Sequence, residues 1–443
     1  MSNQKLSIHI KNFGCKTNYF DAFSVLGRIK QSFDTRITST MSESDVVILN
    51  SCSVTKDAEK ELTKWIKKAK KNGKKVIVTG CLPNLKDINA DLIIGAGRYN
   101  EISQSLIESI FINNEGISNK YVIKDLKING DVINEDIEKA DFESFPRTRA
   151  YIKIQEGCNK FCSFCSIPQT RGLPRFVSEQ KVISKIKELA EKGFKEVVLV
   201  GTHLALYGEE GKNKDKNSTL GKLIKKISKE IKSEIKIRLS SISPKEIDDE
   251  MLEGLYIGKK IFCPHFHIAV QSGSNKILKL MRRWHTFEDF LQDAEKLLKI
   301  FPDACIGTDI IIGFPGETEK EFEETISNIK NSPVGHIHIF PFSPRPKTPA
   351  FFMKSIEEKE QKERVRIALN IAREKRKEFF KKFIGKKLEI LVEETNGKIE
   401  GTTPNYINVV IEQNTKLQKG DKTNCLITGV IEERERIYST AVI

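Results

Sequence analysis

The alternation of strand-like and helix-like segments between Tyr151 and Phe340 is the feature that most constrains this fold. Six runs rich in β-branched and apolar residues recur along this stretch, with helical spans between them. The expected strands are Tyr151–Gln155, Glu196–Val200, Ile235–Leu239, His265–Val270, Cys305–Ile312 and His336–Phe340, and the clearest helices are Glu179–Lys192, Thr286–Ile300 and Glu319–Asn331. Six successive β/α units predict a partial or complete barrel with chemistry at the carboxyl ends of its strands.

The chain before this stretch has a similar rhythm. Strand-like runs occur at Leu6–Phe13, Val46–Leu49 and Lys75–Val78, and Asp57–Lys71 is a helical span. We therefore expect a separate parallel α/β sheet that ends near Ile123. Residues 124–146 are polar and weakly patterned, which is typical of a linker.

The chain after the β/α stretch has a different pattern. Residues 356–383 are rich in Lys, Glu and Arg and predict one long charged helix. Short strands follow, separated by turn residues: Leu388–Glu393, Ile407–Ile411, Asn424–Ile427 and Arg436–Ala441. They predict a small β-barrel. The expected fold class is α/β, with domains at 1–123, 144–376 and 377–443.

Composition sets broader limits. Lys and Arg exceed Asp and Glu by 74 to 60, a net charge of +14, which fits a polyanionic partner and equally fits a solvated lysine-rich surface. No apolar run approaches the roughly 18 residues that a membrane helix needs. Because Met1 to Lys5 lead straight into a strand-like run, we expect no signal peptide, no membrane association and a cytoplasmic location.

A tight cysteine cluster follows the first expected barrel strand. Nine cysteines, an odd number in a large chain without a secretion signal, argue against a disulfide framework. Cys158, Cys162 and Cys165 form a C-x3-C-x2-C run, so one loop can present three thiolates to an iron–sulfur cluster. Three ligands on a four-iron cube leave one iron open to chelate a substrate. The alternative, a zinc knuckle, would bring a fourth Cys or His nearby, and the sequence has none at similar spacing.

Three further cysteines are far apart in sequence but share one placement. Cys15, Cys52 and Cys81 each follow an expected strand within about three residues. The carboxyl ends of parallel strands share one edge of a sheet, so these thiols are expected to converge on a second cluster. Taken singly, each would more often be a buried structural thiol. Cys263, Cys305 and Cys425 lack partners at useful spacing.

These motifs resemble a known family. The C-x3-C-x2-C run resembles the signature of the radical S-adenosylmethionine superfamily, and Cys15, Cys52 and Cys81 match the N-terminal domain of its methylthiotransferase family. Further family-like phrases are Gln155–Cys158, Ile167-Pro168, Arg171-Gly172, Gln271–Ser274 and Gly313–Thr318. The resemblance implies two 4Fe–4S clusters, S-adenosylmethionine as cofactor and a C-terminal TRAM domain that binds RNA.

The resemblance also implies a mechanism and a substrate. One S-adenosylmethionine methylates a sulfur at the Cys15/Cys52/Cys81 cluster, and a second is cleaved to a 5′-deoxyadenosyl radical that abstracts hydrogen from C2 of an adenine in tRNA. Several phrases are similar to the subgroup acting on N6-threonylcarbamoyladenosine-37 of ANN-decoding tRNAs: Cys15–Asn18, Arg238–Ser241, Pro264–His267 and Phe342–Pro346. Phe176 departs from the Ser more common there. The implied partners are the tRNA anticodon loop and a low-potential electron donor of flavodoxin or ferredoxin type.

Three alternatives remain open at this point. The same chemistry could act on isopentenyladenosine-37 or on an aspartate of a ribosomal protein. A rival of another class is a non-catalytic RNA-binding protein whose cysteines hold zinc.

Supporting residues follow from the same resemblance. Gly201 and Thr202 end the second strand, where the superfamily binds the amino group of the cofactor, although a plain turn explains them equally well. Gln271 and Ser272 could reach the ribose hydroxyls of the cofactor. Gly313 and Gly316 allow the backbone to approach its adenine closely. Phe164 could pack on the same adenine. For a substrate carboxylate we expect Arg238 and Arg345; the alternatives are a structural ion pair or a contact to the cofactor. His203, His265 and His267 are left unassigned.

Overall fold

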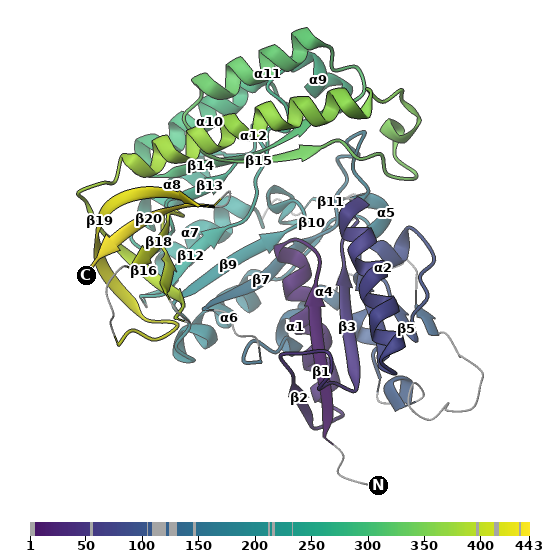
Figure 1. Cartoon of the computed structure of the whole chain (residues 1–443). Helices are drawn as coiled ribbons and strands as arrows, with labels where there is room; N and C mark the ends of the chain where they lie inside the picture. The colour runs from purple at the N-terminus through teal and green to yellow at the C-terminus, as the bar shows by residue number, and fades with distance from the viewer. Residues whose placement is uncertain are drawn as a thin grey trace.

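The protein is described from a computed structural model. The structure describes residues 5–53, 56–103, 105–108, 121–123, 131–144, 148–210, 213–214, 218–232, 234–395, 398–411, 416–433 and 436–443. Figure 1 shows an N-terminal sheet, a central partial barrel and a small C-terminal barrel packed together, and α12 crosses from the central to the C-terminal part. The expected α/β fold class is confirmed.

The N-terminal sheet has six strands in the order β2-β1-β3-β4-β5-β6, all parallel. Its elements are β1 (Leu6–Asn12), α1 (Lys16–Lys30), β2 (Thr35–Ile37), β3 (Val46–Ser51), α2 (Lys56–Lys71), β4 (Lys75–Gly80), η1 (Leu82–Asn84), β5 (Leu92–Ile94), η2 (Tyr99–Glu101) and β6 (Tyr121–Ile123). Three strands were expected. The other three, β2, β5 and β6, have three residues each, too few to establish a periodic pattern.

Alternate residues of β3 divide the N-terminal core between two faces. Val46 and Ile48 pack with residues of α1, and Val47 and Leu49 pack with residues of α2. Every residue of β3 is buried, since both faces of a parallel sheet are covered. The central position of β3 places the loop after it between the loops that follow β1 and β4.

The prediction of a linker over 124–146 is wrong in part. Residues 131–139 form α4 (Asp131–Lys139), in which Ile133, Asp136 and Ile137 are buried; residues 124–130 and 145–147 lie outside the described residues. Asp136 is bonded to Arg28 at 2.9 Å, so a polar position faces inward. That inward carboxylate weakened the apolar pattern from which a helix could have been predicted.

The central domain is a partial barrel. The strands β7 (Arg149–Glu156), β9 (Glu196–Gly201) and β12 (Lys236–Leu239) pair in parallel, as do β13 (His265–His267), β14 (Cys305–Ile312) and β15 (Val334–Pro341). The bridges Ile237 to Phe262 and Ile242 to Ile268 join the two sheets. All six expected strands are present, and α1 of the N-terminal domain packs beside β7, with Tyr19 stacked on Tyr151.

Helices surround this barrel. They are α5 (Ile167–Arg171), α6 (Glu179–Glu191), α7 (Leu220–Glu230), α8 (Asp249–Ile257), α9 (Asn275–Leu280), α10 (Phe287–Ile300) and α11 (Glu319–Asn331), with η3 (Leu204–Leu206) and η4 (Pro349–Phe352). The domain also contains three short strands. The strand β8 (Arg175–Phe176) pairs antiparallel with β7, and β10 (Glu209–Glu210) pairs with β11 (Asn213–Lys214). Among the described residues, no helix is both long and apolar enough to cross a bilayer.

The C-terminal domain is a closed five-stranded barrel in the order β16-β17-β18-β20-β19. Its strands are β16 (Lys387–Glu394), β17 (Ile399–Thr402), β18 (Asn408–Ile411), β19 (Lys422–Glu433) and β20 (Arg436–Val442). Four strands were expected; β17, with four residues that include Gly401, was missed. The domain limits themselves remain a prediction.

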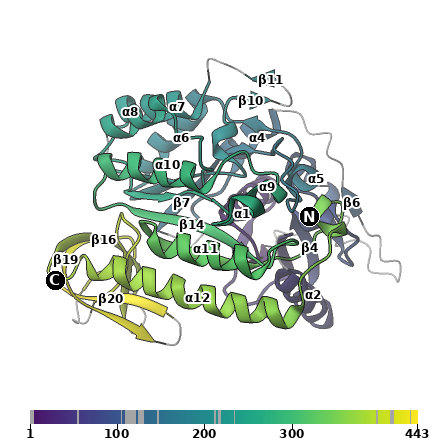
Figure 2. The same cartoon turned by 90° about the horizontal axis from the view of Figure 1, so that it is seen from above.

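Two features tie the C-terminal barrel to the central one. The helix α12 (Glu358–Lys381) runs beside α11, as Figure 2 shows, and its Phe379 and Phe380 belong to the core of the C-terminal barrel. The turn between β17 and β18 reaches the other way: Asn405 Nδ2 donates to Asp303 O at 3.1 Å. In the same turn Tyr406, with φ +70°, stacks on His265 at 4.1 Å between ring centres.

Candidate active site between two cysteine sets

The loop after β7 presents the contiguous cysteines Cys158, Cys162 and Cys165. Gly157 starts it with φ +82°, and a Cβ there would lie 2.0 Å from the carbonyl oxygen of Leu173, so only glycine fits. Cys158 N donates to Gly172 O at 3.0 Å, and Thr202 Oγ1 donates to Gly157 O at 2.9 Å. The loop is therefore held from both sides where it begins.

Cationic side chains lie beside these thiols. Burial, with the charges of Cys162 and Cys158, raises the pKa of Cys165 to about 12. Arg283 Nη1 lies 3.4 Å from Cys162 Sγ. Burial alone would lower the pKa of His203, but hydrogen bonds with Cys158 and Glu246 outweigh it and raise the pKa to about 9. Two cationic side chains therefore lie against the cysteine loop, where their charge would complement that of a thiolate-bound cluster.

The second set lies at the carboxyl edge of the N-terminal sheet. Cys15 follows β1, and Cys52 and Cys81 come directly after β3 and β4, three neighbouring strands. Cys81 N donates to Ser51 O at 3.1 Å. Burial and the charge of Cys15 raise the pKa of Cys81, against the effect of Arg171. The three strand ends thus bring together cysteines separated by 37 and 29 positions.

A buried asparagine joins the loops of this second set. Asn18 Nδ2 donates to Asn50 Oδ1 and to Ser51 O, both at 2.9 Å, and Asn50 Nδ2 donates back to Asn18 O. Cys15 Sγ lies 3.2 Å from Asn18 Oδ1. Asn18 is fully buried, so it fixes the relative positions of the first two loops.

The spacing of the thiols bears on the zinc alternative. In a tetrahedral zinc site with bonds of ~2.3 Å, sulfur atoms lie roughly 3.8 Å apart. Among the described residues, neither set brings three ligand atoms within 4.8 Å of one another; that closeness occurs only at His267, Asp309 and His338.

The two sets face one another across the domain boundary. Ser53 and Ser166, which follow Cys52 and Cys165, have their hydroxyl oxygens 3.2 Å apart. Asn84 Nδ2, three residues after Cys81, donates to Thr170 O at 2.6 Å. The loops that carry the two sets are therefore in direct contact.

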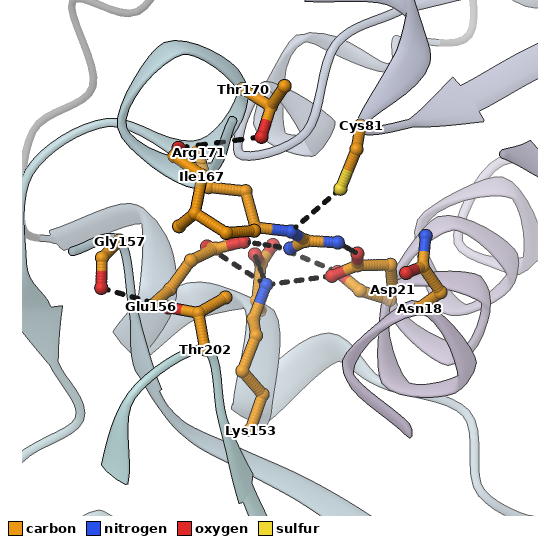
Figure 3. A network of polar contacts seen from close by, with 12 residues as sticks. Asn18, Asp21, Cys81, Lys153, Glu156, Gly157, Ile167, Thr170, Arg171 and Thr202 are labelled. Carbon is orange, nitrogen blue, oxygen red and sulfur yellow. Dashed lines mark hydrogen bonds and ion pairs between the residues drawn. The ribbon is translucent and has the colours of Figure 1, made fainter. Parts of the chain in front are cut away.

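A buried network of charges joins the two domains beneath these loops (Figure 3). Arg171 of α5 is at its centre: its Nη2 donates to Asp21 Oδ2 at 2.6 Å, its Nη1 to Glu156, and its Nε to Cys81 Sγ at 3.1 Å. Lys153 Nζ lies 2.9 Å from Asp21 Oδ1 and 3.1 Å from Glu156 Oε2. Although burial opposes it, the surrounding cations hold the pKa of Glu156 well below its usual range. An arginine of the central domain therefore contacts a cysteine of the N-terminal set.

Three of the expected cofactor-binding residues lie at or near this loop. Gly201 ends β9 and Thr202 follows it. Gln155 connects them to the cysteine loop: its Oε1 accepts from Thr202 Oγ1 at 3.3 Å, and its Nε2 donates to Gly157 O at 2.8 Å. Phe164 is half-buried and packs with Met281 and Phe314. The assignment of these residues to the cofactor stays a prediction.

The other expected cofactor residues are placed less favourably. Ser272 is fully buried and its hydroxyl contacts Thr325, which gives its assignment to the ribose no support. Gln271, with φ +78°, joins β14 through its backbone. Gly313 and Gly316 have φ of +76° and +92°, conformations that favour glycine at a strand end. Gly313 N donates to Glu317 Oε1 at 3.0 Å.

The two arginines expected to bind substrate both have partners within the protein. Arg238 is buried; its Nε and Nη2 donate to Glu196 at 2.7 and 3.0 Å, and its Nη1 donates to Pro404 O. Arg345 pairs with Glu59 of α2 and donates to Ser343 Oγ at 2.7 Å. Both arginines are therefore engaged in ion pairs within the protein. This was the alternative to their expected role in binding the substrate.

Comparison with known proteins places this arrangement in a family. Residues 152–329 match the Radical SAM superfamily, and residues 7–93 match Uncharacterized protein family UPF0004. The chain is 37% identical to threonylcarbamoyladenosine tRNA methylthiotransferase MtaB of Aquifex aeolicus, over 91% of this chain and 96% of the relative. The chain belongs to the radical S-adenosylmethionine tRNA methylthiotransferase family.

Other relatives of the enzyme differ in the substrate they name. The Bacillus subtilis MtaB is 35% identical over 92% of this chain and 90% of the relative. The tRNA-2-methylthio-N(6)-dimethylallyladenosine synthase of Orientia tsutsugamushi is 31% identical over 92% and 93%. The expectation of two 4Fe–4S clusters and S-adenosylmethionine as cofactors, and of a tRNA substrate, is confirmed. Membership of this enzyme family also excludes the alternative of a non-catalytic RNA-binding protein whose cysteines hold zinc.

One solved structure shows the same fold at low identity. The radical S-adenosylmethionine methyltransferase TsrM from Kitasatospora setae, with cobalamin and a [4Fe–4S] cluster bound, has a TM-score of 0.54 at 12% identity. The match covers 78% of this chain and 74% of that chain. At this identity the likeness concerns the fold alone.

Sequence reasoning gave no role to the side chains that contact the cysteines, and it left His203 unassigned. Arg283, His203 and Asn18 contact cysteines of one set or the other, and Arg171 contacts Cys81. Arg171 and Asn18 stood within family-like phrases but received no role. Their contacts depend on tertiary packing over separations of 90 and 121 residues for Arg171 and Arg283, which no local spacing reveals.

Proposed function

We propose that this enzyme converts N6-threonylcarbamoyladenosine-37 of ANN-decoding tRNAs to its 2-methylthio derivative. The contact between the two cysteine loops supports the chemistry of this proposal. A carbon radical formed at one cluster must meet the sulfur at the other before it is quenched. The relatives of 34–37% identity named for threonylcarbamoyladenosine support the substrate, above the 30–31% of those named for dimethylallyladenosine.

The role of each cysteine set follows from its surroundings. When bound, the clusters and S-adenosylmethionine supply radical and sulfur-transfer chemistry. Cys158, Cys162 and Cys165 would hold the cofactor-cleaving cluster, since their loop lies at the carboxyl end of β7. Cys15, Cys52 and Cys81 would hold the sulfur-donating cluster. Because an anticodon-loop purine is already single-stranded, it leaves its stack at little cost and enters between them.

The proposal includes two partners and a place. The anticodon loop is the RNA element recognised, and a flavodoxin- or ferredoxin-type protein supplies the electron. The basic charge of the chain favours RNA binding and an acidic redox partner alike. Because tRNA is the substrate, we place the enzyme in the cytoplasm.

Nucleoside analysis tests the proposal. The enzyme is expressed in cells that lack their own counterpart, and tRNA nucleosides are measured by mass spectrometry. 2-Methylthio-N6-threonylcarbamoyladenosine should appear. If only the methylthio-isopentenyl nucleoside or a modified ribosomal aspartate appears, the substrate assignment is wrong while the chemistry survives.

A further inference from the structure

The strands β13, β14 and β15 present a polar face toward the interior of the partial barrel. Phe266, Ile306 and Ile310 lie on their other face, in the core shared with the surrounding helices. Four histidines and one carboxylate occupy the inner face: His265, His267, His336, His338 and Asp309. Register pairs His267 with Gly307, Gly307 with His336, and Asp309 with His338. Asp309 Oδ1 contacts His267 at 2.9 Å and His338 at 3.1 Å, so this oxygen already has hydrogen-bond partners.

Lys16 brings a cation from the N-terminal domain to this face. It is the first residue of α1 and is joined by a peptide bond to the cluster ligand Cys15. Lys16 Nζ lies 6.0 Å from the centre of the Tyr406 ring. That ring stacks on His265 at 4.1 Å and lies 5.5 Å from His336. The lysine side chain therefore extends from a cysteine of one cluster to the histidines inside the barrel.

Lys16 differs from the other cations of this cluster because it lacks a partner. Arg238 is held by Glu196, and Arg376 lies 3.0 Å from His336 Nε2 and 2.5 Å from Asn408 Oδ1. Within the part of the chain that the structure describes, the ammonium group of Lys16 makes no ion pair or hydrogen bond. A largely enclosed ammonium without an acceptor is costly, and a bound anion would remove that cost.

Unsatisfied ring nitrogens give a second, independent indication. His265 is 2% exposed, and neither of its nitrogens has a hydrogen-bond partner among the described residues; His336 Nδ1 is also buried without one there. Buried polar atoms are nearly always bonded. Arg376 donates to Nε2 of His336, so Nδ1 of that ring carries its proton, and one nitrogen of His265 carries a proton as well. These two N–H groups indicate a ligand with oxygen atoms. Cation and nitrogens lie around one aromatic ring, that of Tyr406.

We propose that Lys16, with His265 and His336, binds the carboxylate on the N6 substituent of the substrate adenosine. This inference rests on the proposed function. In adenine, C2 and C6 flank N1 and their substituents point in diverging directions, so a base whose C2 meets the sulfur held at the Cys15/Cys52/Cys81 cluster directs its N6 substituent along the same ring edge and away from that sulfur. Lys16 extends away from the same cysteine, and its ammonium forms a charge-assisted bond with the carboxylate.

Two other anions fit this position less well. A phosphate belongs to the RNA backbone, which stays outside the barrel when a single base enters it. The cofactor carboxylate belongs at the loop after β7, on the carboxyl side of the strands, whereas His265 begins β13 and His336 is the third residue of β15. The Lys16 cluster is therefore nearer the opposite ends of these strands.

The test uses reconstituted enzyme and two anticodon stem-loops. One carries N6-threonylcarbamoyladenosine, and the other carries its methyl ester, which lacks the charge. Wild-type enzyme should bind the acid roughly tenfold or more tightly than the ester, the range of a hydrogen bond to a charged group. Lys16→Gln should bind both equally, and Lys16→Arg should regain part of the preference. Lys64→Gln, which removes an exposed lysine of α2, is the matched control and should keep the full preference.

Each other outcome decides the question. Equal binding of acid and ester by the wild-type enzyme, which needs no variant to fold, overturns the inference. So does a preference that survives in Lys16→Gln with normal iron content and absorption spectrum. If Lys16→Gln weakens binding of S-adenosylmethionine without RNA to the same extent, the cation serves the cofactor and the inference is wrong. Failure of the proposed function is separate: the wild-type enzyme would then form no methylthio-threonylcarbamoyladenosine at all.

Discussion

The two cysteine sets reach similar ends by different physical means. Cys158, Cys162 and Cys165 lie within eight positions on one loop, so their closeness is a property of local chain geometry. Cys15, Cys52 and Cys81 are brought together by the pairing of β1, β3 and β4 and by the buried side chain of Asn18. A contiguous site depends on its own loop, whereas a dispersed site depends on the stability of the whole sheet.

The largest expected effect separates the two sets completely. Replacing Cys158, Cys162 and Cys165 by Ala should abolish formation of 5′-deoxyadenosine, while about half of the iron stays bound at the other set. Iron analysis and product chromatography on the anaerobically purified variant measure both. A folded variant that has lost all its iron would show that the sets are not independent sites.

A smaller effect is expected where the two sets are joined. Arg171→Met removes one of the two cations that Asp21 and Glu156 share in a buried network, the other being Lys153, a loss of about 3–5 kcal/mol. The melting temperature should fall, and iron should be lost from the dispersed set first, because Arg171 contacts Cys81. Arg36→Met, at an exposed position of β2, is the control. Equal loss of iron from both sets would contradict the asymmetry.

The scaffold of the dispersed set can be tested alone. Asn18→Ala removes a side chain that bonds Asn50 and Ser51 O, at a cost of about 1–3 kcal/mol for each buried group left unpaired. Cluster spectra should change for the dispersed set only, and uncoupled cleavage of S-adenosylmethionine should persist. If electron paramagnetic resonance instead shows a change in the cluster of the contiguous set, Asn18 does not support the dispersed set.

The smallest effect concerns the contact between the sets. Ser53→Ala and Ser166→Ala each remove one side of a single hydroxyl contact, worth about 1 kcal/mol or less. A double-mutant cycle on unfolding free energy should give a coupling of that size. A coupling of zero would mean that the two loops are neighbours without an energetic link.

The difference between the sets also explains what sequence could predict. Spacing alone placed the contiguous thiols, and strand order in a parallel sheet placed the dispersed ones. The partners of Arg238 and Arg345 could not be predicted, since Glu196 and Glu59 lie 42 and 286 positions away. Lys16 was visible only as part of a family-like phrase. Its neighbours come from β13, β15 and the turn after β17, which only the folded chain brings together.

The turn that carries Tyr406 has a consequence for the order in which the enzyme is made. Every cysteine of the two sets leaves the ribosome more than two hundred residues before this turn, and domains fold as they emerge. Until then, the histidine face of the central barrel lacks the ring that stacks on it, and Phe379 and Phe380 lack their core. The two cysteine loops are thus complete early, while the interior beside them is closed last.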